Sequence, residues 1–72
     1  MKKIYISTEF IKLDQFLKWI NAVESGVEAK FLISEGMVKV NNEIELRRGR
    51  KLYEDDIVEI DGKEYKVKIQ KK

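Results

Sequence analysis

The segment from Ser25 to Gly36 constrains the fold more than any other stretch, because both of its ends carry the marks of a short helix. Ser25 with Glu28 fits the S-x-x-E capping box, in which the serine oxygen accepts a backbone N–H and the glutamate reaches back to the N–H of the cap residue. Gly36 can adopt the left-handed conformation that ends a helix. Val38 and Val40 then alternate with polar residues, as in a strand. The sequence therefore predicts a helix that leads directly into a strand.

The buried face of this helix is predicted from the spacing of its apolar residues. Five of them recur at near-helical spacing and can share one face: Val27, Phe31 and Leu32, widened by Ala29 and Ile33. We expect Phe31 to be buried, so that its replacement by alanine would destabilise so small a domain severely.

An amphipathic helix is also predicted earlier in the chain, from about Lys12 to Ala22. Its apolar residues fall at i, i+3, i+4 and i+7: Leu13, Phe16, Leu17 and Ile20. Asp14 lies in the first turn, where the helix dipole favours a negative charge. Trp19 lies at the edge of the apolar stripe, where packing is favoured over stacking on an unpaired base. Two helices joined this closely should pack as a hairpin.

Alternation of apolar and polar residues predicts strands over four stretches: residues 3–7, 37–41, 44–47 and, as a hairpin, 57–69. Asn41-Asn42 suits the tight turn between the second and third stretches, because asparagine tolerates positive φ. In the returning strand, Ile44 and Leu46 form the apolar side. Asp61-Gly62 is among the strongest short-range hairpin signals.

With 72 residues the chain can form one small domain, spanning residues 1–72. Cysteine and histidine are absent, which excludes disulfides, thiolate metal sites and histidine chemistry. We therefore expect no catalysis, no cofactor and no metal site. The acids Glu54, Asp55 and Asp56 are only a weak indication of a magnesium site, because neighbouring acids in a loop more often solvate a turn. Neither a membrane-spanning run nor a secretory signal is found, so a cytoplasmic location without a membrane partner is expected.

The charge pattern is more informative than the net charge of +2. Four of the five residues from Arg47 to Lys51 are basic, in an irregular segment anchored by Leu52. Such clustering costs repulsion that a bound polyanion would relieve, which favours a nucleic-acid role over solubility for this loop. A second basic group is interpreted as a solvated surface: Lys63, Lys66, Lys68, Lys71 and Lys72.

The run LDQFLKWINAVESGVEAKFLISEGMVKVNNEIELRRGRKLYEDDIVEI resembles the S4 RNA-binding domain. That family has a basic residue, Leu-Asp, two helices, Gly-x-Val-x-Val-Asn-Gly and a later Gly-Asp before a closing strand. The resemblance covers residues from about 12 to 60. Within the family the chain is most similar to small stand-alone bacterial S4 proteins of the YaaA type, which share the Ser-Gly-x-x-Ala-Lys step at residues 25–30 and the Glu-x-Arg-Arg-Gly-Arg-Lys-Leu run at residues 45–52.

The resemblance implies the S4-like (alpha-L) α+β fold, an αα hairpin packed on a small twisted, mostly antiparallel sheet. It also implies a monomer that binds structured RNA, commonly ribosomal RNA, in ribosome assembly or translation, with ribosomal proteins as possible partners. Carried over by position, it points to RNA contacts at ten residues: Lys12, Gln15, Gly26, Lys30, Lys39, Asn41, Arg47, Arg48, Arg50 and Lys51.

The chain departs from the family pattern at three places. Gly26 stands where many S4 domains have an arginine, which removes one phosphate contact but agrees with the YaaA-type proteins. Asn42 replaces the glycine of the Val-Asn-Gly turn, and Asp55 replaces the glycine of the later Gly-Asp. Neither change should undo the fold. Tyr53, beside the basic loop, remains open between packing and base contact.

Two other classes of function remain open. A helix-turn-helix DNA-binding protein would also have two short helices, but its second helix should carry the base-reading side chains, and here that helix has few outside Lys30. A protein-interaction module that docks on a ribosomal protein or an assembly factor would predict binding that survives nuclease treatment and moderate salt. Taken singly, four lysines are better interpreted as ordinary surface residues: Lys12, Lys18, Lys30 and Lys39.

Overall fold

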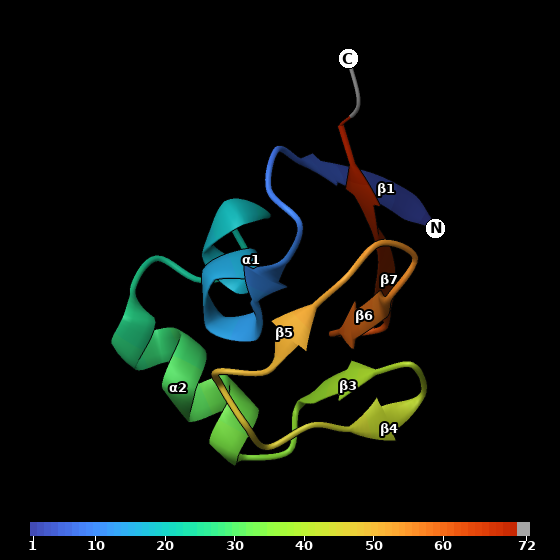
Figure 1. Cartoon of the computed structure of the whole chain (residues 1–72). Coiled ribbons are helices and arrows are strands. Elements are labelled where there is room, and N and C mark those ends of the chain that lie inside the picture. Colours follow the sequence, from blue (N-terminus) through green and yellow to red (C-terminus); the bar gives the residue numbers. More distant parts are fainter. Residues whose placement is uncertain (71–72) are drawn as a thin grey trace.

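Two short helices pack beside a small twisted sheet in the computed structural model, which describes residues 1–70 (Figure 1). Lys71 and Lys72, part of the predicted basic C-terminal group, lie outside the described residues. The elements follow in chain order: β1 (Lys2–Ile6), β2 (Ile11–Lys12), α1 (Leu13–Trp19), α2 (Gly26–Ser34), β3 (Val38–Val40), β4 (Glu43–Ile44), β5 (Lys51–Leu52), β6 (Ile57–Ile60) and β7 (Lys63–Ile69). The predicted α+β class is confirmed.

The main sheet has five strands in the order β1-β7-β6-β3-β4. Only the β1–β7 pairing is parallel, so the sheet is mostly antiparallel as predicted. Both predicted hairpin turns have two consecutive residues with positive φ: Asn41 (52°) with Asn42 (70°), and Asp61 (54°) with Gly62 (75°). Two-residue turns of this kind match the right-handed twist of the flanking strands, which is why the sequence identified them correctly.

Both helices end in the same backbone arrangement. At the end of α2, Gly36 has a φ of 74°, and the N–H groups of Gly36 and Met37 donate to the carbonyls of Ile33 and Leu32, each at 3.1 Å. At the end of α1, Asn21 has a φ of 60°, and the N–H of the next residue, Ala22, donates to Leu17 at 2.9 Å. These are Schellman motifs. Asparagine therefore ends α1 earlier than the predicted Ala22.

The start of α2 confirms the serine cap. The Ser25 hydroxyl oxygen accepts the backbone N–H of Glu28 at 3.2 Å. The Glu28 carboxylate does not take the N–H of Ser25 as the capping box predicts. It accepts the N–H of Glu24 at 2.7 Å, one residue further back. The glutamate thus fixes the entry of the chain into α2 as well as its first turn.

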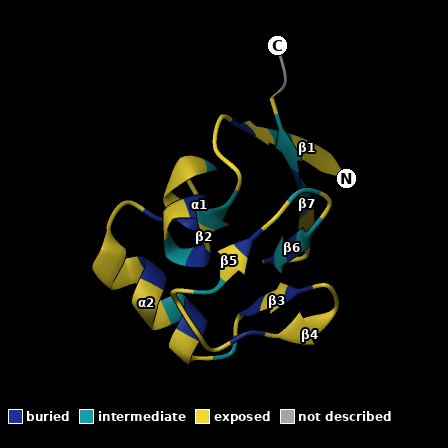
Figure 2. Cartoon of the chain, in the orientation of Figure 1, coloured by how far each residue is buried: buried dark blue, intermediate teal, exposed yellow. Residues whose placement is uncertain are grey.

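The predicted apolar face of α2 is wrong for Val27 and Phe31, which are 81% and 59% exposed. Ala29 and Ile33 are the residues buried against the core, with Leu32 half-buried beside them (Figure 2). At 3.6 residues per turn, positions two apart point about 200° away from each other. The helix therefore carries two apolar stripes on opposite sides. The stripe with Ala29 and Ile33 packs against the core, and the stripe with Val27 and Phe31 faces solvent.

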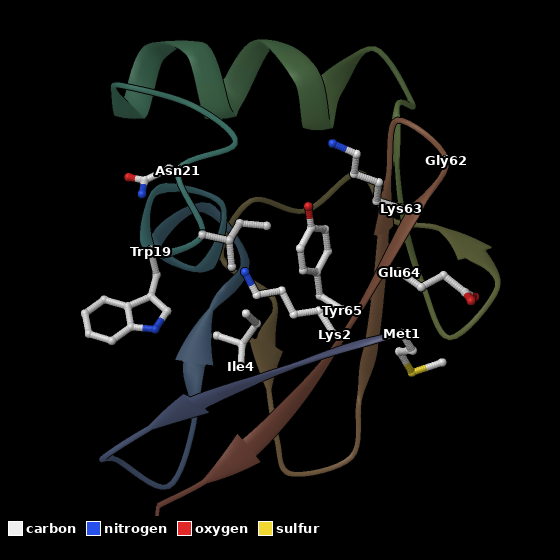
Figure 3. A pocket seen from close by; sticks show the side chains of 10 residues that line it. Met1, Lys2, Ile4, Trp19, Asn21, Gly62, Lys63, Glu64 and Tyr65 are labelled. Carbon is white, nitrogen blue, oxygen red and sulfur yellow. The ribbon is translucent and has the colours of Figure 1, made fainter.

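Two further predictions of packing are wrong. Trp19 is 61% exposed, and its indole projects from the end of α1 instead of covering the core (Figure 3). In the strand that returns from the Asn41-Asn42 turn, Ile44 and Leu46 are exposed and Glu45 is buried. The register explains this inversion: Ile44 pairs with exposed Lys39, while the N–H of Glu45 donates to the carbonyl of buried Val38 at 3.0 Å.

A second, two-stranded sheet was not predicted. It pairs Ile11 with Leu52 and Lys12 with Lys51 in antiparallel register. Strands of two residues have no periodicity that a sequence pattern can reveal. The predicted anchoring role of Leu52 is confirmed, because its side chain is fully buried.

The core depends most on α1, whose residues Leu13, Phe16 and Leu17 are completely buried. We expect Phe16→Ala to lower the free energy of unfolding by about 3–5 kcal/mol, because it removes the largest of the fully buried side chains. Chemical denaturation followed by circular dichroism measures this. Phe31→Ala is the matched control, and its exposure predicts a change within about 0.5 kcal/mol. Equal losses in the two variants would contradict the burial pattern.

Candidate nucleic-acid interface

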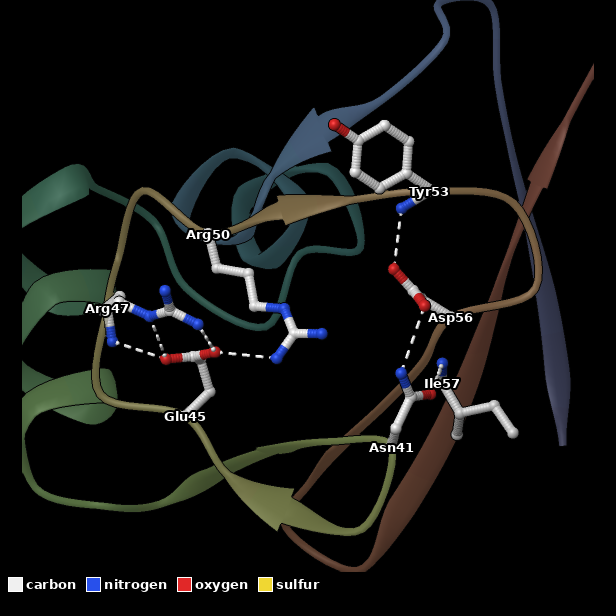
Figure 4. A network of polar contacts seen from close by, with 7 residues as sticks. All are labelled: Asn41, Glu45, Arg47, Arg50, Tyr53, Asp56 and Ile57. Carbon is white, nitrogen blue, oxygen red and sulfur yellow. Dashed lines mark hydrogen bonds and ion pairs between the residues drawn. The ribbon is translucent and has the colours of Figure 1, made fainter.

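The basic loop, residues 45–51, is held in place by a buried carboxylate. Glu45 is 6% exposed, and Arg47 grips it with two parallel bonds, from Nε to Oε2 at 3.0 Å and from Nη2 to Oε1 at 3.1 Å (Figure 4). The Arg47 backbone N–H also donates to Oε2 at 3.0 Å. Arg50 approaches from the other side of the loop and donates from Nη1 to Oε1 at 2.9 Å. One carboxylate therefore determines the shape of the loop.

The two arginines stabilise the charged form of Glu45. The hydrogen bonds from the Arg47 side chain lower the pKa of Glu45 to about 2, with a further contribution from Arg50, against the opposing effect of burial. In return, the Glu45 carboxylate raises the pKa of Arg47. The Arg47 side chain remains 76% exposed and that of Arg50 30% exposed. Both guanidinium groups are thus fixed at one edge. The Arg47 side chain lies mostly in solvent, whereas that of Arg50 is largely covered.

The loop is joined to the start of α1 through its backbone. The first helical N–H groups, of Leu13 and Asp14, donate to the carbonyls of Arg50 at 2.8 Å and Arg48 at 3.1 Å. Lys12, at the N-cap position, makes no side-chain cap, so the loop carbonyls stabilise this end of the helix. The β2–β5 pairing also sets Lys12 opposite Lys51. The structure thus brings together predicted site residues that are far apart in the sequence.

The remaining predicted residues lie on other elements. Gly26 and Lys30 are exposed on α2, and Figures 1 and 4 both show the basic loop passing beside this helix. A Cβ at Gly26 would meet nothing within 4 Å, so no packing constraint requires glycine there. Gln15 is exposed on α1, and Lys39 is exposed on β3 between Ile44 and Glu59 on the neighbouring strands.

Asn41, like Arg47 and Arg50, uses its side chain within the fold, because its side-chain amide makes two intramolecular bonds. Its Nδ2 donates to Asp56 at 3.1 Å, and its Oδ1 accepts the backbone N–H of Ile57 at 3.0 Å (Figure 4). These bonds connect the end of β3 to the start of β6. Asn41 therefore serves the fold directly, whatever it contributes to binding.

The acidic residues after β5 also have structural partners. Asp56 accepts the backbone N–H of Tyr53 at 2.8 Å. The Nζ of Lys68 lies 2.9 Å from Oδ1 of Asp55 and 3.7 Å from Oε2 of Glu54. The hydrogen bond to Asp55 is the main reason that the pKa of Lys68 is raised. Within residues 1–70, no group of three or more acidic side chains could hold a metal ion. Neither helix in the same range has the length and apolar character needed to span a bilayer.

An aromatic pair, Phe10 and Tyr53, borders the basic loop. Phe10 was not predicted from the sequence. Phe10 and Tyr53 lie with ring centroids 5.9 Å apart at an angle of 48°. The Lys51 ammonium lies 4.8 Å from the centroid of the Phe10 ring, a cation–π contact. Phe10 precedes the short strand β2, and no motif pointed to it. The one feature of the sequence that could have indicated Phe10 is its position two residues before Lys12-Leu13-Asp14.

Comparison with known proteins gives consistent matches. A family model, the S4 domain, matches residues 4–68. A relative from Bacillus subtilis (strain 168), "Probable ribosome maturation protein RlbA", is 54% identical over 59 residues, which cover 82% of this chain and 83% of the relative. The solved structure of YbcJ from E. coli is described as having an alfaL motif involved in RNA-binding. It has a TM-score of 0.70 at 30% identity, and the match covers 94% of this chain and 87% of the YbcJ chain.

A more distant solved structure shares the fold alone. The 30S ribosomal protein S4e from Thermoplasma acidophilum has a TM-score of 0.63 at 20% identity. The match covers 83% of this chain but only 32% of that protein. The fold of this chain thus also occurs as one part of a larger protein.

We expect Glu45→Gln to lower the free energy of unfolding at neutral pH by about 1–3 kcal/mol, because it removes the charged acceptor shared by Arg47 and Arg50. The pKa of Glu45 in the folded state, about 2, lies below its ordinary value of 4.5. Its stabilising contribution is therefore complete above about pH 4.5 and is lost as the pH falls towards 2. Thermal unfolding of the variant should depend less on pH across that window.

Glu43→Gln provides the control, since Glu43 is exposed on β4 and the same charge is removed. Its unfolding curves should stay close to those of the unmodified protein. If Glu45→Gln unfolds with the same pH dependence as the unmodified protein, the carboxylate does not hold the loop.

Proposed function

The chain belongs to the S4 domain family, and on that premise we propose that it binds structured RNA, specifically ribosomal RNA, and acts in ribosome assembly. The ribosome maturation role named for the 54% identical Bacillus relative supports this assignment, as does the RNA-binding motif described for YbcJ. We propose that it acts as a monomeric single domain in the cytoplasm, without catalysis, and that ribosomal proteins can be further partners.

The observation that carries the proposal is the fixed basic loop. Flexible cations lose conformational freedom when they bind phosphate, whereas the Glu45 contacts already hold Arg47 and Arg50 in place. Arginine suits this task because its planar fork can offer parallel N–H bonds to phosphate oxygens. A rigid array of such donors fits the regular phosphate spacing of a folded RNA better than the changing phosphate spacing of an unstructured RNA.

The ten residues predicted from the family pattern then divide by their surroundings. Arg48 and Lys51 are exposed in the loop, and Lys12 pairs with Lys51, so we assign phosphate contacts to these three. Arg47 and Arg50 combine phosphate contact with support of the loop. Gln15, Gly26, Lys30 and Lys39 extend the surface over α1, α2 and β3, while Asn41 positions the strand. Recognition by shape and phosphates is favoured because double-helical RNA presents its bases poorly to side chains.

A second candidate function, docking on a protein, is favoured by one observation. Val27 and Phe31 form an exposed apolar stripe on α2. If this stripe were the main binding surface, association with ribosomal particles would survive nuclease treatment and moderate salt, and Phe31→Ser would abolish it.

To test RNA binding, we would change Arg48 and Lys51 together to alanine. The double variant should bind ribosomal RNA more weakly, and the slope of log affinity against log salt should become shallower by about 1 to 2, because up to two phosphate contacts are lost. Folding should be almost unaffected, since Glu45 keeps Arg47 and Arg50. Filter binding across a salt series measures both quantities.

The control is Lys3→Ala with Lys66→Ala, a pair of register partners on β1 and β7. This variant removes the same charge from the main sheet, away from the basic loop, and its affinity and salt slope should remain near those of the unmodified protein. An equal effect of both pairs would mean that only overall charge matters. Crosslinking in cells with the loop variant as reference then identifies the bound region of RNA.

A further inference from the structure

We propose that the groove between Phe10 and Trp19 binds unpaired nucleotides that flank the structured RNA held by the basic loop. This inference rests on the proposed function and adds to it a second kind of ligand, single-stranded RNA. The groove has a volume of about 460 Å³ and runs between the turn after β1 and the exposed side of α1. Ser7, Thr8 and Gln15 supply polar groups along it, and the two aromatic side chains stand at its borders.

Trp19 is the exposed aromatic side chain of the groove, at 61%. Phe10 is half-buried, in contact with Lys51 and with Tyr53, which lies outside the groove and is 50% exposed. An indole contributes more to stability than most side chains when it is buried, yet this one is left in water at the end of α1. Gln15 and Trp19 are four residues apart, so they lie on the same side of the helix. Flat aromatic faces beside hydrogen-bonding groups are what unpaired bases require for stacking and edge contacts.

Positive charge lies at both ends of this aromatic surface. At one end Lys51 stacks on Phe10 and pairs across the strands with Lys12. At the other end Trp19 also borders a second open hollow of about 680 Å³, which Lys2, Lys63 and Tyr65 line; the acidic Glu64 lines it too, but its carboxylate points away from Trp19 (Figure 3). A strand of RNA that left the basic loop would therefore meet cations, then aromatic faces, then cations again, the arrangement that tracks a single-stranded backbone.

The dimensions agree with a short single strand. Gln15 and Trp19, the residues of α1 that line the groove, lie about 6 Å apart along the helix axis, which is room for about two stacked bases at about 3.4 Å each. A double helix could not use the groove, because its bases are already stacked on each other. A proline-rich peptide could also use aromatic faces, but the flanking lysines favour a polyanion.

The test uses Trp19 as a built-in probe, since it is the only tryptophan in the sequence. We would titrate the protein with a blunt RNA hairpin and with the same hairpin carrying a single-stranded uridine tail, and follow tryptophan fluorescence together with the anisotropy of labelled RNA. The tailed hairpin should quench Trp19 and bind about tenfold more tightly than the blunt one.

Variants separate this inference from the proposed function. Trp19→Ala should remove the tenfold gain while binding the blunt hairpin normally, and Trp19→Phe should retain much of the gain because a stacking face remains. Circular dichroism checks that both variants fold, as the exposure of Trp19 predicts. The Arg48 and Lys51 double variant should weaken binding of both hairpins.

Each other outcome overturns the inference. Equal binding of both hairpins without quenching would leave the proposed function intact and remove the groove from the site. Quenching by a proline-rich peptide but not by the tailed hairpin would make the groove a protein-binding site. Failure of the protein to bind either hairpin or ribosomal RNA would refute the proposed function and this inference together.

Discussion

The grip of two arginines on the buried Glu45 carboxylate is the contact on which the functional surface depends. A carboxylate that is 6% exposed is stable in its charged form only if it is paired and hydrogen-bonded, and Arg47 and Arg50 meet that requirement from two sides of one loop. The folded loop then offers its carbonyls to the first N–H groups of α1. The basic loop and the first helix therefore stabilise each other.

This arrangement lets one set of residues serve both structure and binding. Arg47 keeps most of its guanidinium in solvent while one edge holds Glu45, so its positive charge is available without being mobile. Arg48 and Lys51 are exposed on the same loop. A cluster of like charges is costly by itself, and the negative charge of Glu45 beneath it offsets part of the repulsion. The basic surface is thus compatible with a stable free protein.

Most of the secondary structure was predictable because its signals are local. Ser25, Gly36 and Asp61-Gly62 each determine the backbone of a few neighbouring residues, and the structure has them as predicted. The stop at Asn21 was missed because asparagine adopts positive φ less often than glycine. The candidate site followed from the resemblance and from the charge run. The contacts of Phe10 beside the basic loop could not be predicted in this way, because its partners Lys51 and Tyr53 lie about forty residues away in the sequence.

The sequence by itself determined the approximate places of both helices and of most strands, the two hairpin turns and the places where positive charge is concentrated, since backbone preferences and charge act over a few residues. Only the tertiary structure decided which of the two apolar stripes of α2 faces the core, that Trp19 stays in solvent and that Glu45 points inward. Burial depends on what the rest of the chain places opposite a residue. For Glu45 that was decided by the register with Val38 and by the two arginines that lie in the loop.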